Sequence, residues 1–185
     1  YIEEQCGIHL GDDKSYLVQN RLSNLVRECG CSSFGEFYHR IRYAPQSSTL
    51  EDAVLDAIAT NETLWFRDRH PFRVLGEAVL PRLSGEIAAG RRQRIAIWSA
   101  ACSTGQEPYS IAMTALDFAP GKARGRSWEE RVRITATDVS NKSLAAAREG
   151  RYFEAAIRRG LPPAYLNGYF RKVENRWVID DRVRE

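Results

Sequence analysis

Residues 94–110 read RIAIWSAACSTGQEPYS, and this stretch decides the fold class. Its first five residues form a short apolar run of the kind found in buried parallel strands. Small residues follow at 99–105 as a turn, and the pattern at 108–118 predicts a helix. A second strand is predicted at 133–137, and another helix at 142–148. Strand, turn, helix, strand and helix in this order make a βαβ unit, which indicates an α/β domain.

Residues 1–60 show helical periodicity and almost no strand pattern. Six apolar residues fall on one arc of a first helix: Leu17, Val18, Leu22, Leu25, Val26 and Cys29. Asp12 or Asp13 can cap the start of this helix, and Gly30 can end it. The pattern predicts a small helical bundle.

Further helices are expected after the first one, both within residues 1–60 and beyond the segment 61–70. Residues 33–36 (SFGE) have the spacing of a capping box that opens a second helix, and a third helix carries the apolar residues of 50–58. Pro71 suits a helix start and leads an amphipathic stretch that continues to about Ala89. Pro81 is expected to kink or divide that stretch, because proline cannot donate the helical hydrogen bond.

These patterns predict two domains. We expect a helical domain at 1–60, a junction segment at 61–70 and an α/β domain at 71–185. The chain opens on Tyr1 rather than Met and stops at Glu185, directly after the strand-like residues RWVI. We therefore expect a fragment in which the C-terminal part of the α/β domain is missing.

Composition excludes several classes of protein. An apolar content of 43% and a charged content of 28% are typical of a soluble globular chain. No apolar run approaches the roughly 18 residues of a membrane span, and no signal segment opens the chain, so we expect a cytoplasmic protein. The four cysteines form no CxxC pair and the three histidines are scattered, which predicts reduced thiols and no metal site.

Charge is distributed unevenly along the chain. Residues 1–60 carry five basic and nine acidic side chains, a balance of −4, and the whole chain carries +3, so residues 61–185 carry +7. The difference supports two domains. A net charge of +3 is weak support for nucleic-acid binding, which normally requires a much more basic domain.

The turn at 99–105 and Asp138 both lie at the carboxyl edge of the predicted sheet, where open α/β sheets bind ligands. Small residues let a ligand lie against the backbone, and an acidic residue after a strand can accept hydrogen bonds from ribose hydroxyls. Each feature also has an ordinary interpretation, as a tight βα connection and as a helix N-cap. Together in one βαβ unit, they indicate a nucleoside cofactor.

The segment 60–68 (TNETLWFRD) mixes aromatic side chains with amide, hydroxyl and guanidinium groups. Such clusters at a domain junction often line ligand clefts. The alternative is a packing segment in which Arg67 pairs with Asp68 or another carboxylate. Composition alone does not choose between them.

Three stretches carry a resemblance to a known family: TNxTxxFR at 60–67, WSAAxSTGxEPYS at 98–110 and ATD at 136–138. Residues 7–8 (GI) and 20–22 (NRL) also fit. On these residues the chain resembles the CheR family, the chemoreceptor glutamate methyltransferases, over essentially its whole length. The resemblance implies a small N-terminal helical domain followed by a class I, Rossmann-like methyltransferase domain.

The resemblance also implies a set of residues that contact S-adenosylmethionine: Asn61, Thr63, Arg67, Ala101, Ser103, Glu107 and Asp138. Asp138 would hold the ribose, and the 99–105 turn would pass beneath the amino-acid end of the cofactor. Arg67 lies near the reacting centre in the family and is the candidate catalytic residue. Its guanidinium suits either the substrate carboxylate or the carboxylate of the cofactor. The catalytic tyrosine of the family belongs to later strands that this chain lacks.

The implied activity is methyl transfer from S-adenosylmethionine to glutamate side chains of chemoreceptors, forming methyl esters in chemotaxis adaptation and releasing S-adenosylhomocysteine. We expect a monomer that is not membrane-inserted, whose partner is the cytoplasmic methylation region of the receptors rather than nucleic acid. Two alternatives stay open: a regulatory module that binds S-adenosylmethionine without catalysis, and a methyltransferase that acts on another substrate.

Arg21 and Arg27 resemble basic residues on the helix that docks on the negatively charged methylation region. A helical wheel separates the two, because Arg21 falls inside the apolar arc and Arg27 on the polar side. A charge on the apolar side should reach a partner carboxylate or lie at a binding surface, since an unpaired buried charge is costly. Arg27 also fits an ordinary solvated face.

Overall fold

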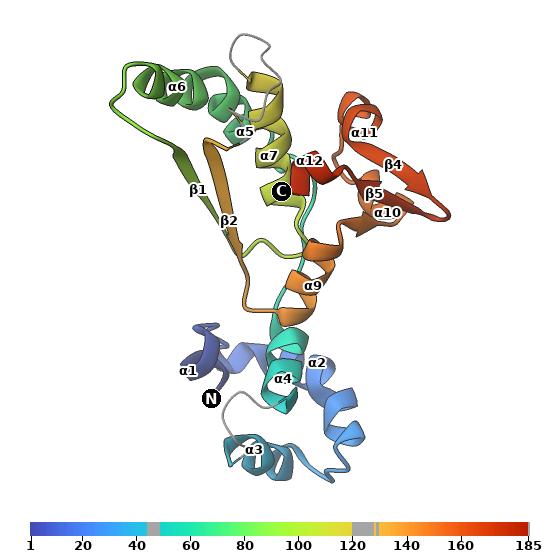
Figure 1. Ribbon diagram of the computed structural model, residues 1–185. Coiled ribbons are helices and arrows are strands. Elements are labelled where there is room, and N and C mark those ends of the chain that lie inside the picture. The colour runs from blue at the N-terminus through green and yellow to red at the C-terminus, as the bar shows by residue number, and fades with distance from the viewer. Residues whose placement is uncertain (44–48, 120–127, 129, 185) are drawn as a thin grey trace. The chain divides into compact units, whose positions relative to one another are not determined.

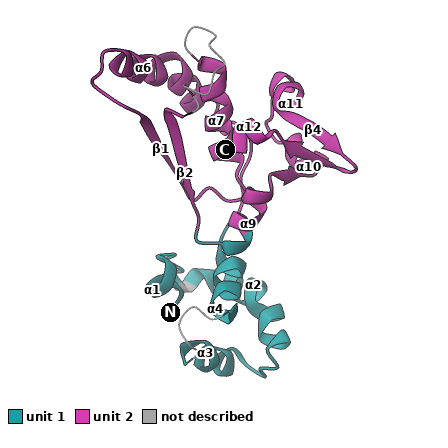
Figure 2. Ribbon diagram, in the orientation of Figure 1, with its two compact units in different colours: residues 1–60, 139–142 teal, residues 61–138, 143–185 magenta. Residues whose placement is uncertain are grey.

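The computed structural model describes residues 1–43, 49–119, 128 and 130–184. The chain divides into two compact units, shown in Figures 1 and 2: residues 1–60 with 139–142, and residues 61–138 with 143–185. No described helix combines the length and the apolar character that a membrane span requires.

The first unit consists of short helices around one apolar core (Figure 1). Its elements are α1 (Ile2–Cys6), a 3-10 turn (Asp12–Lys14), α2 (Ser15–Glu28), α3 (Phe34–Arg42) and α4 (Thr49–Ile58). Its buried core residues are Leu22, Val26, Cys31, Phe37, Ile41, Val54 and Ile58. The apolar arc predicted for the first helix faces this core through Leu22 and Val26.

Helix ends in this unit follow local capping chemistry, with one correction. Gly30 takes a φ of 69° just after α2 and ends the helix as predicted. The Ser33 hydroxyl accepts a hydrogen bond of 3.1 Å from the N–H of Glu36, so the predicted cap of α3 is confirmed. The expectation that Asp12 or Asp13 caps α2 is wrong. Both lie in a 3-10 turn that leads directly into the helix, which begins without a side-chain cap.

The second unit contains the predicted βαβ arrangement. The arrangement consists of β1 (Ile95–Ala100), α7 (Gln106–Phe118), β2 (Val132–Thr137) and α9 (Asn141–Glu149), of which the first two residues of α9 belong to the first unit. The two strands are parallel, and their register runs from Ile95 beside Val132 to Ala100 beside Thr137. Both strands therefore end at the same edge, which brings together the residues that follow them.

The stretch that carries Pro81 is divided, as expected. It forms α5 (His70–Val74), a π-helical turn (Leu75–Val79) and α6 (Leu80–Ala88). In the π turn, the N–H of Leu80 donates to the carbonyl of Leu75, five residues earlier. This local widening lies just before Pro81, at a point where such a turn accommodates a break in the helical ladder.

A second, antiparallel sheet follows α9, and only its strand at 176–179 was expected from the sequence. Its elements are β3 (Arg151–Tyr152), α10 (Glu154–Ile157), α11 (Pro163–Tyr169), β4 (Phe170–Val173), β5 (Arg176–Ile179) and α12 (Asp181–Arg184). The strand order is β3-β5-β4, with β5 in the centre. A two-residue strand such as β3 is too short to show a period of two, so its sequence carries no strand pattern.

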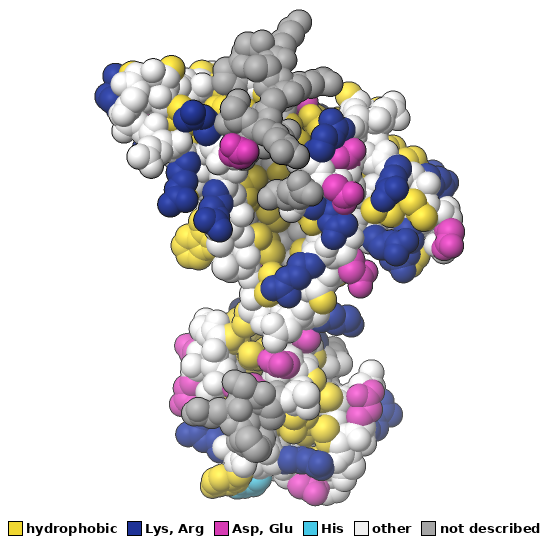
Figure 3. All heavy atoms as spheres, in the orientation of Figure 1, with side chains coloured by type: hydrophobic (Ala, Val, Ile, Leu, Met, Phe, Trp, Pro, Cys, Tyr) yellow, Lys and Arg dark blue, Asp and Glu magenta, His cyan; other side chains and the backbone are white. Residues whose placement is uncertain are grey.

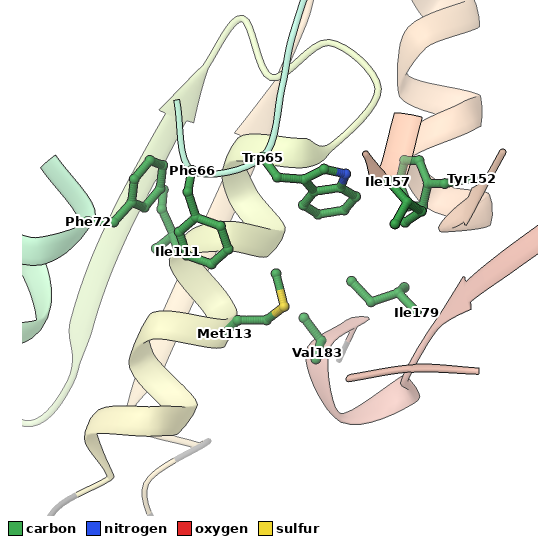
Figure 4. Close-up of a cluster of buried hydrophobic side chains, with 9 residues drawn as sticks. All are labelled: Trp65, Phe66, Phe72, Ile111, Met113, Tyr152, Ile157, Ile179 and Val183. Atoms are coloured by element: carbon green, nitrogen blue, oxygen red, sulfur yellow. The ribbon is translucent and has the colours of Figure 1, made fainter. Parts of the chain in front are cut away.

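An aromatic cluster anchors the junction segment within the second unit (Figure 4). Trp65 is 0% exposed and Phe66 is 7% exposed. The Trp65 ring meets Tyr152 of β3 and Phe170 of β4 edge-on, with centroid distances of 4.9 and 5.3 Å. Among the described residues, its indole N–H has no hydrogen-bond partner, so packing alone holds the indole.

Candidate functional site

The turn between β1 and α7 has a backbone conformation that favours small residues. Ala101, Ser103 and Gly105 have φ values of 57°, 49° and 95°, a region that residues other than glycine rarely adopt. A Cβ atom at Gly105 would lie 3.0 Å from the Cβ of Ala147 and 3.1 Å from the Tyr152 hydroxyl. Glycine is therefore required at 105 both for its backbone conformation and for the close approach of its neighbours.

Two hydrogen bonds join this turn to the end of β2. The Cys102 N–H donates to the Thr137 carbonyl at 2.9 Å, and the Ser103 N–H donates to the Asp138 carboxylate at 2.7 Å. The turn and the acidic residue, which the sequence placed at the same sheet edge, are thus in direct contact. Asp138 is half-buried, and its carboxylate lies beside the turn that would receive a ligand.

Glu107 is held at the start of α7 by the strand before it. Ser99 is 0% exposed, and its hydroxyl donates to the Glu107 carboxylate at 2.7 Å. The adjacent Trp98 is 70% exposed, and its indole N–H donates to the Thr137 hydroxyl at 3.0 Å. An acidic group in the first turn of a helix is favoured by the helix dipole. The strand end thus presents an acidic group and a broad aromatic face.

The junction segment lies against the same turn. The Ser103 hydroxyl donates to the Asn61 carbonyl at 2.9 Å, and the Phe66 N–H donates to the Ser110 hydroxyl at 3.1 Å. Thr63, between these two attachments, is half-buried. Residues from all three sequence stretches, at 60–67, 98–110 and 136–138, therefore meet at one edge of β1 and β2.

Arg67 is exposed, and no partner for its guanidinium is found among the residues that the structure describes. Among the described residues, Arg67 and Asp68 do not form the ion pair that the packing alternative predicted. The backbone around it is strained, since Phe66, Asp68 and Arg69 have φ values of 49°, 62° and 50°. Such conformations cost about 1–3 kcal/mol each and are concentrated at functional sites. The strain fits a binding segment better than a simple packing segment.

Local electrostatics make the turn cysteine unreactive. Burial raises the pKa of the Cys102 thiol, and the negative charge of Asp138 raises it further. A thiol held neutral in this way is a poor nucleophile and a poor metal ligand. Within the described ranges, no group of three side chains could hold a metal ion. On the face that Figure 3 shows, Lys and Arg side chains of the second unit lie at several separate places.

The two candidate docking arginines have different surroundings in the first unit. Arg21 is half-buried and donates to the carbonyl of Ile58, to the carbonyl of Ala59 at 3.4 Å and to the hydroxyl of Thr60 at 3.2 Å. It therefore binds the end of α4 and not the carboxylate that its place on the wheel suggested, because the last carbonyls of a helix also attract a cation. Arg27 is exposed, and its described partner is the Asn24 side chain.

An apolar cavity of about 250 Å³ also opens in the second unit, between α7, β2, α9 and α12. Residues from all four elements line it, including Leu116, Ile134, Ala147 and Val183. Cys102 of the turn contributes to its wall, as do Arg148, Arg182 and Arg184. Neither Ser103 nor Asp138 lines this cavity, so we place the candidate site at the strand ends.

Sequence reasoning missed the contacts of two tyrosine hydroxyls, of which Tyr152 bonds to the turn and Tyr109 bonds to α9. The Tyr152 hydroxyl donates to the Thr104 carbonyl at 2.8 Å, and the Tyr109 hydroxyl donates to the Ala147 carbonyl at 2.6 Å. Neither residue follows a local pattern that would reveal its contact, since these partners lie 48 and 38 positions away along the chain.

The fold and the site together define a class of protein. A small helical unit precedes an α/β unit whose small-residue turn and acidic strand end meet at the carboxyl ends of two parallel strands. This is the architecture of a Rossmann-like domain that binds a nucleoside cofactor. Comparison with known families makes the class more specific. The family model described as CheR methyltransferase, SAM binding domain, matches residues 61–185, and the CheR methyltransferase all-alpha domain matches residues 1–58.

The chain belongs to the CheR methyltransferase family. It is 45% identical over all 185 residues to chemotaxis protein methyltransferase 1 of Pseudomonas aeruginosa, and 44% identical over 185 residues to the chemotaxis protein methyltransferase of Vibrio parahaemolyticus. The corresponding protein of Salmonella typhimurium is 37% identical over 169 residues, which are 91% of this chain. The chain spans 65%, 64% and 53% of the lengths of these three relatives.

Proposed function

We propose that this chain is the cofactor-binding part of a methyltransferase that esterifies glutamate side chains of chemoreceptors in chemotaxis adaptation. Residues 1–60 would dock the substrate, 61–70 would contribute to the site, and 71–185 would bind the cofactor. The observation that carries the proposal is the 2.7 Å hydrogen bond from the Ser103 N–H to Asp138, in a chain that belongs to this family. It joins the small-residue turn to the acidic strand end, the two parts that a nucleoside cofactor requires.

The residues present suit S-adenosylmethionine. Ala101 is small and exposed beside the turn, so a ligand can approach the backbone there. Asp138 would accept from the ribose hydroxyls, and Glu107 supplies a second acidic group near the cofactor's positively charged end. Asn61, Thr63 and Ser103 would complete the wall of the site, since Ser103 is bonded directly to the Asn61 carbonyl. When bound, S-adenosylmethionine supplies an activated methyl group on a sulfonium, and S-adenosylhomocysteine is the product.

The chemistry asks the protein for alignment rather than for a base. A glutamate carboxylate has an ordinary pKa of about 4.3, so it is already ionised and nucleophilic at neutral pH. Well-oriented reactants can gain up to about 7–11 kcal/mol from positioning alone. Arg67 is exposed beside the site, and its fork of donors can orient the substrate carboxylate or hold the carboxylate of the cofactor. Either role makes Arg67 the catalytic candidate of this chain.

The partner we propose is the acidic methylation region of chemoreceptors, which lies in the cytoplasm, with the enzyme acting as a monomer. Arg27 is an exposed cation on α2 that could contact it. Arg21 could contribute through α2 as well, although its guanidinium is already engaged by α4. A net charge of only +3 favours this partner over nucleic acid, which normally requires a much more basic domain.

Methyl transfer to a glutamate-rich receptor methylation region tests the proposal. The protein at its natural length is incubated with S-adenosylmethionine labelled in the methyl group, and the product is treated with alkali. Carboxyl methyl esters release labelled methanol, whereas methylated nitrogen retains the label. Base-stable label would point to another substrate, and cofactor binding without any transfer would point to a regulatory module. Failure to bind S-adenosylmethionine or S-adenosylhomocysteine would end the proposal.

A further inference from the structure

Tyr152 of β3 lies directly below the turn that would receive the cofactor. It is 5% exposed, and its hydroxyl donates to the Thr104 carbonyl at 2.8 Å. Burial raises the pKa of this hydroxyl well above its usual value, so it stays protonated and remains a donor throughout the neutral range. The three-stranded sheet, which carries none of the family's sequence stretches, thus reaches the turn through one side chain.

The same ring also contacts the junction segment. Tyr152 meets Trp65 edge-on at a centroid distance of 4.9 Å (Figure 4). The ring of Phe170 lies 6.4 Å from that of Tyr152. Trp65 leads directly into Phe66 and Arg67. One residue therefore touches the turn with its hydroxyl and the junction segment with its ring.

The turn has a physical reason to need this support. Thr104 lies between Ser103, at φ 49°, and Gly105, at φ 95°. A residue other than glycine in the left-handed region is held there only when surrounding contacts oppose its relaxation. The hydroxyl of Tyr152 binds the carbonyl in the middle of this strained stretch. The N–H groups of Cys102 and Ser103 also tie the turn to the end of β2, so loss of the Tyr152 bond would loosen the turn and lower the fraction of molecules that keep its conformation.

We propose that Tyr152 is a positioning residue that holds the cofactor turn in its binding conformation through the Thr104 carbonyl. This inference rests on the proposed function, because it assigns to the small antiparallel sheet a share in S-adenosylmethionine binding. Affinity for a ligand falls in proportion to the population of the competent state. Loss of the bond should therefore weaken cofactor binding through the conformation of the turn.

Tyr152→Phe tests the proposal, with Tyr109→Phe as the matched control. Each variant keeps its ring and loses one hydroxyl that donates to a backbone carbonyl, but the partner of Tyr109 is Ala147 in α9 and not the turn. Titration calorimetry with S-adenosylhomocysteine should give a Kd raised about two- to tenfold for Tyr152→Phe, the range expected for one neutral hydrogen bond. The control should stay within about twofold. Turnover of Tyr152→Phe should approach that of the parent when S-adenosylmethionine is saturating.

Two further measurements separate the possible failures. Thermal melts of both variants show whether they lose stability alike, as a purely structural role would require. If Tyr152→Phe and Tyr109→Phe have similar melts and also the same Kd for S-adenosylhomocysteine, Tyr152 supports the fold only and the inference is overturned. Should Tyr152→Phe fail to fold, amide exchange in the parent without cofactor decides the matter. The Ser103 and Gly105 amides should be protected, and rapid exchange there would equally overturn it. A parent protein that binds no S-adenosylhomocysteine overturns the proposed function instead.

Discussion

The backbone N–H of Ser103 and the carboxylate of Asp138 form a hydrogen bond of 2.7 Å across 35 residues of sequence. Ser103 lies in the turn after β1 and Asp138 follows β2, so the bond closes the edge where the two parallel strands end. Hydrogen bonds that involve an ionised group are stronger than neutral ones. The carboxylate therefore shapes the turn, and under the proposed function it would also bind the ribose, so a change at Asp138 would affect both.

Asp138→Ala should weaken S-adenosylmethionine and S-adenosylhomocysteine binding together, because both carry the ribose. Loss of a charged hydrogen bond of roughly 1.5–3 kcal/mol corresponds to about ten- to hundredfold in Kd. Asp138→Asn is the matched variant, since it keeps an acceptor for the Ser103 N–H without the charge, and its effect should be smaller. Calorimetry with both ligands checks this. Unchanged affinity of Asp138→Ala for both would refute the ribose assignment.

Arg67→Lys should change either cofactor affinity or turnover. The substitution keeps the charge and loses the paired donors of the guanidinium. If Arg67 holds the carboxylate of the cofactor, the Kd for S-adenosylhomocysteine rises; if it orients the substrate, kcat falls at unchanged Kd. Arg73→Lys, at an exposed position of α5, serves as the control. Full turnover together with full cofactor affinity would rule out both roles.

Arg21→Ala and Arg27→Ala should differ in their effect on stability. Arg21 donates to the end of α4, and its loss leaves carbonyls of Ile58 and Ala59 without this cation. For Arg21→Ala we expect the free energy of unfolding to fall by about 1–3 kcal/mol, which lowers the melting temperature. Receptor methylation should also be slower. Because Arg27 is exposed, Arg27→Ala should leave the melting temperature unchanged.

The docking role of Arg27 is tested by salt. Exposed charges are screened by added ions, so Arg27→Ala should slow methylation more at low salt than at high salt. A salt series of methylation rates for the variant and its parent measures this. Identical rates at every salt concentration would remove Arg27 from the docking surface.

Gly160→Ala should be strongly destabilising. Gly160 has a φ of 98°, and a Cβ atom there would overlap the backbone carbonyl oxygen of Trp65. We expect a loss of roughly 2–4 kcal/mol in unfolding free energy, from backbone strain and overpacking combined. Gly168→Ala in α11 is the control, because nothing lies within 4 Å of its added Cβ. Denaturant unfolding of both variants gives the comparison, and equal midpoints would contradict the close approach at Gly160.

Alkaline pH should destabilise the second unit through its buried tyrosines. Burial raises the folded-state pKa of Tyr109, Tyr152 and Tyr165 above the ordinary value of about 10. The stability that these tyrosines contribute to the folded state is fully present below a pH of about 10. It is lost as the pH rises toward the folded-state pKa, because the unfolded chain releases protons that the folded chain retains. Ultraviolet titration of phenolate in the folded and the denatured chain measures the difference. Coincident curves would show that these hydroxyls are not buried.

Local pattern was enough to predict the elements that are long and periodic. The periodicity of apolar residues and the small-residue turns depend only on residues close together in the sequence. The βαβ order at 94–148 and the helices of 1–60 could therefore be predicted from the sequence. The same holds for the cap at Ser33 and for the break at Pro81. The family was recognisable because its stretches are local as well.

Only the tertiary structure decided which groups meet. Arg21 was expected to reach a partner carboxylate or to lie at a binding surface, yet its described partners lie 37 to 39 residues away at the end of another helix. Tyr152 belongs to a two-residue strand that shows no period, and its contact with Thr104 spans 48 positions. Hydrogen bonds of this kind depend on how elements pack and not on local propensity. The sequence by itself therefore determined the elements, the class and the family of this protein, and packing determined the contacts that shape its site.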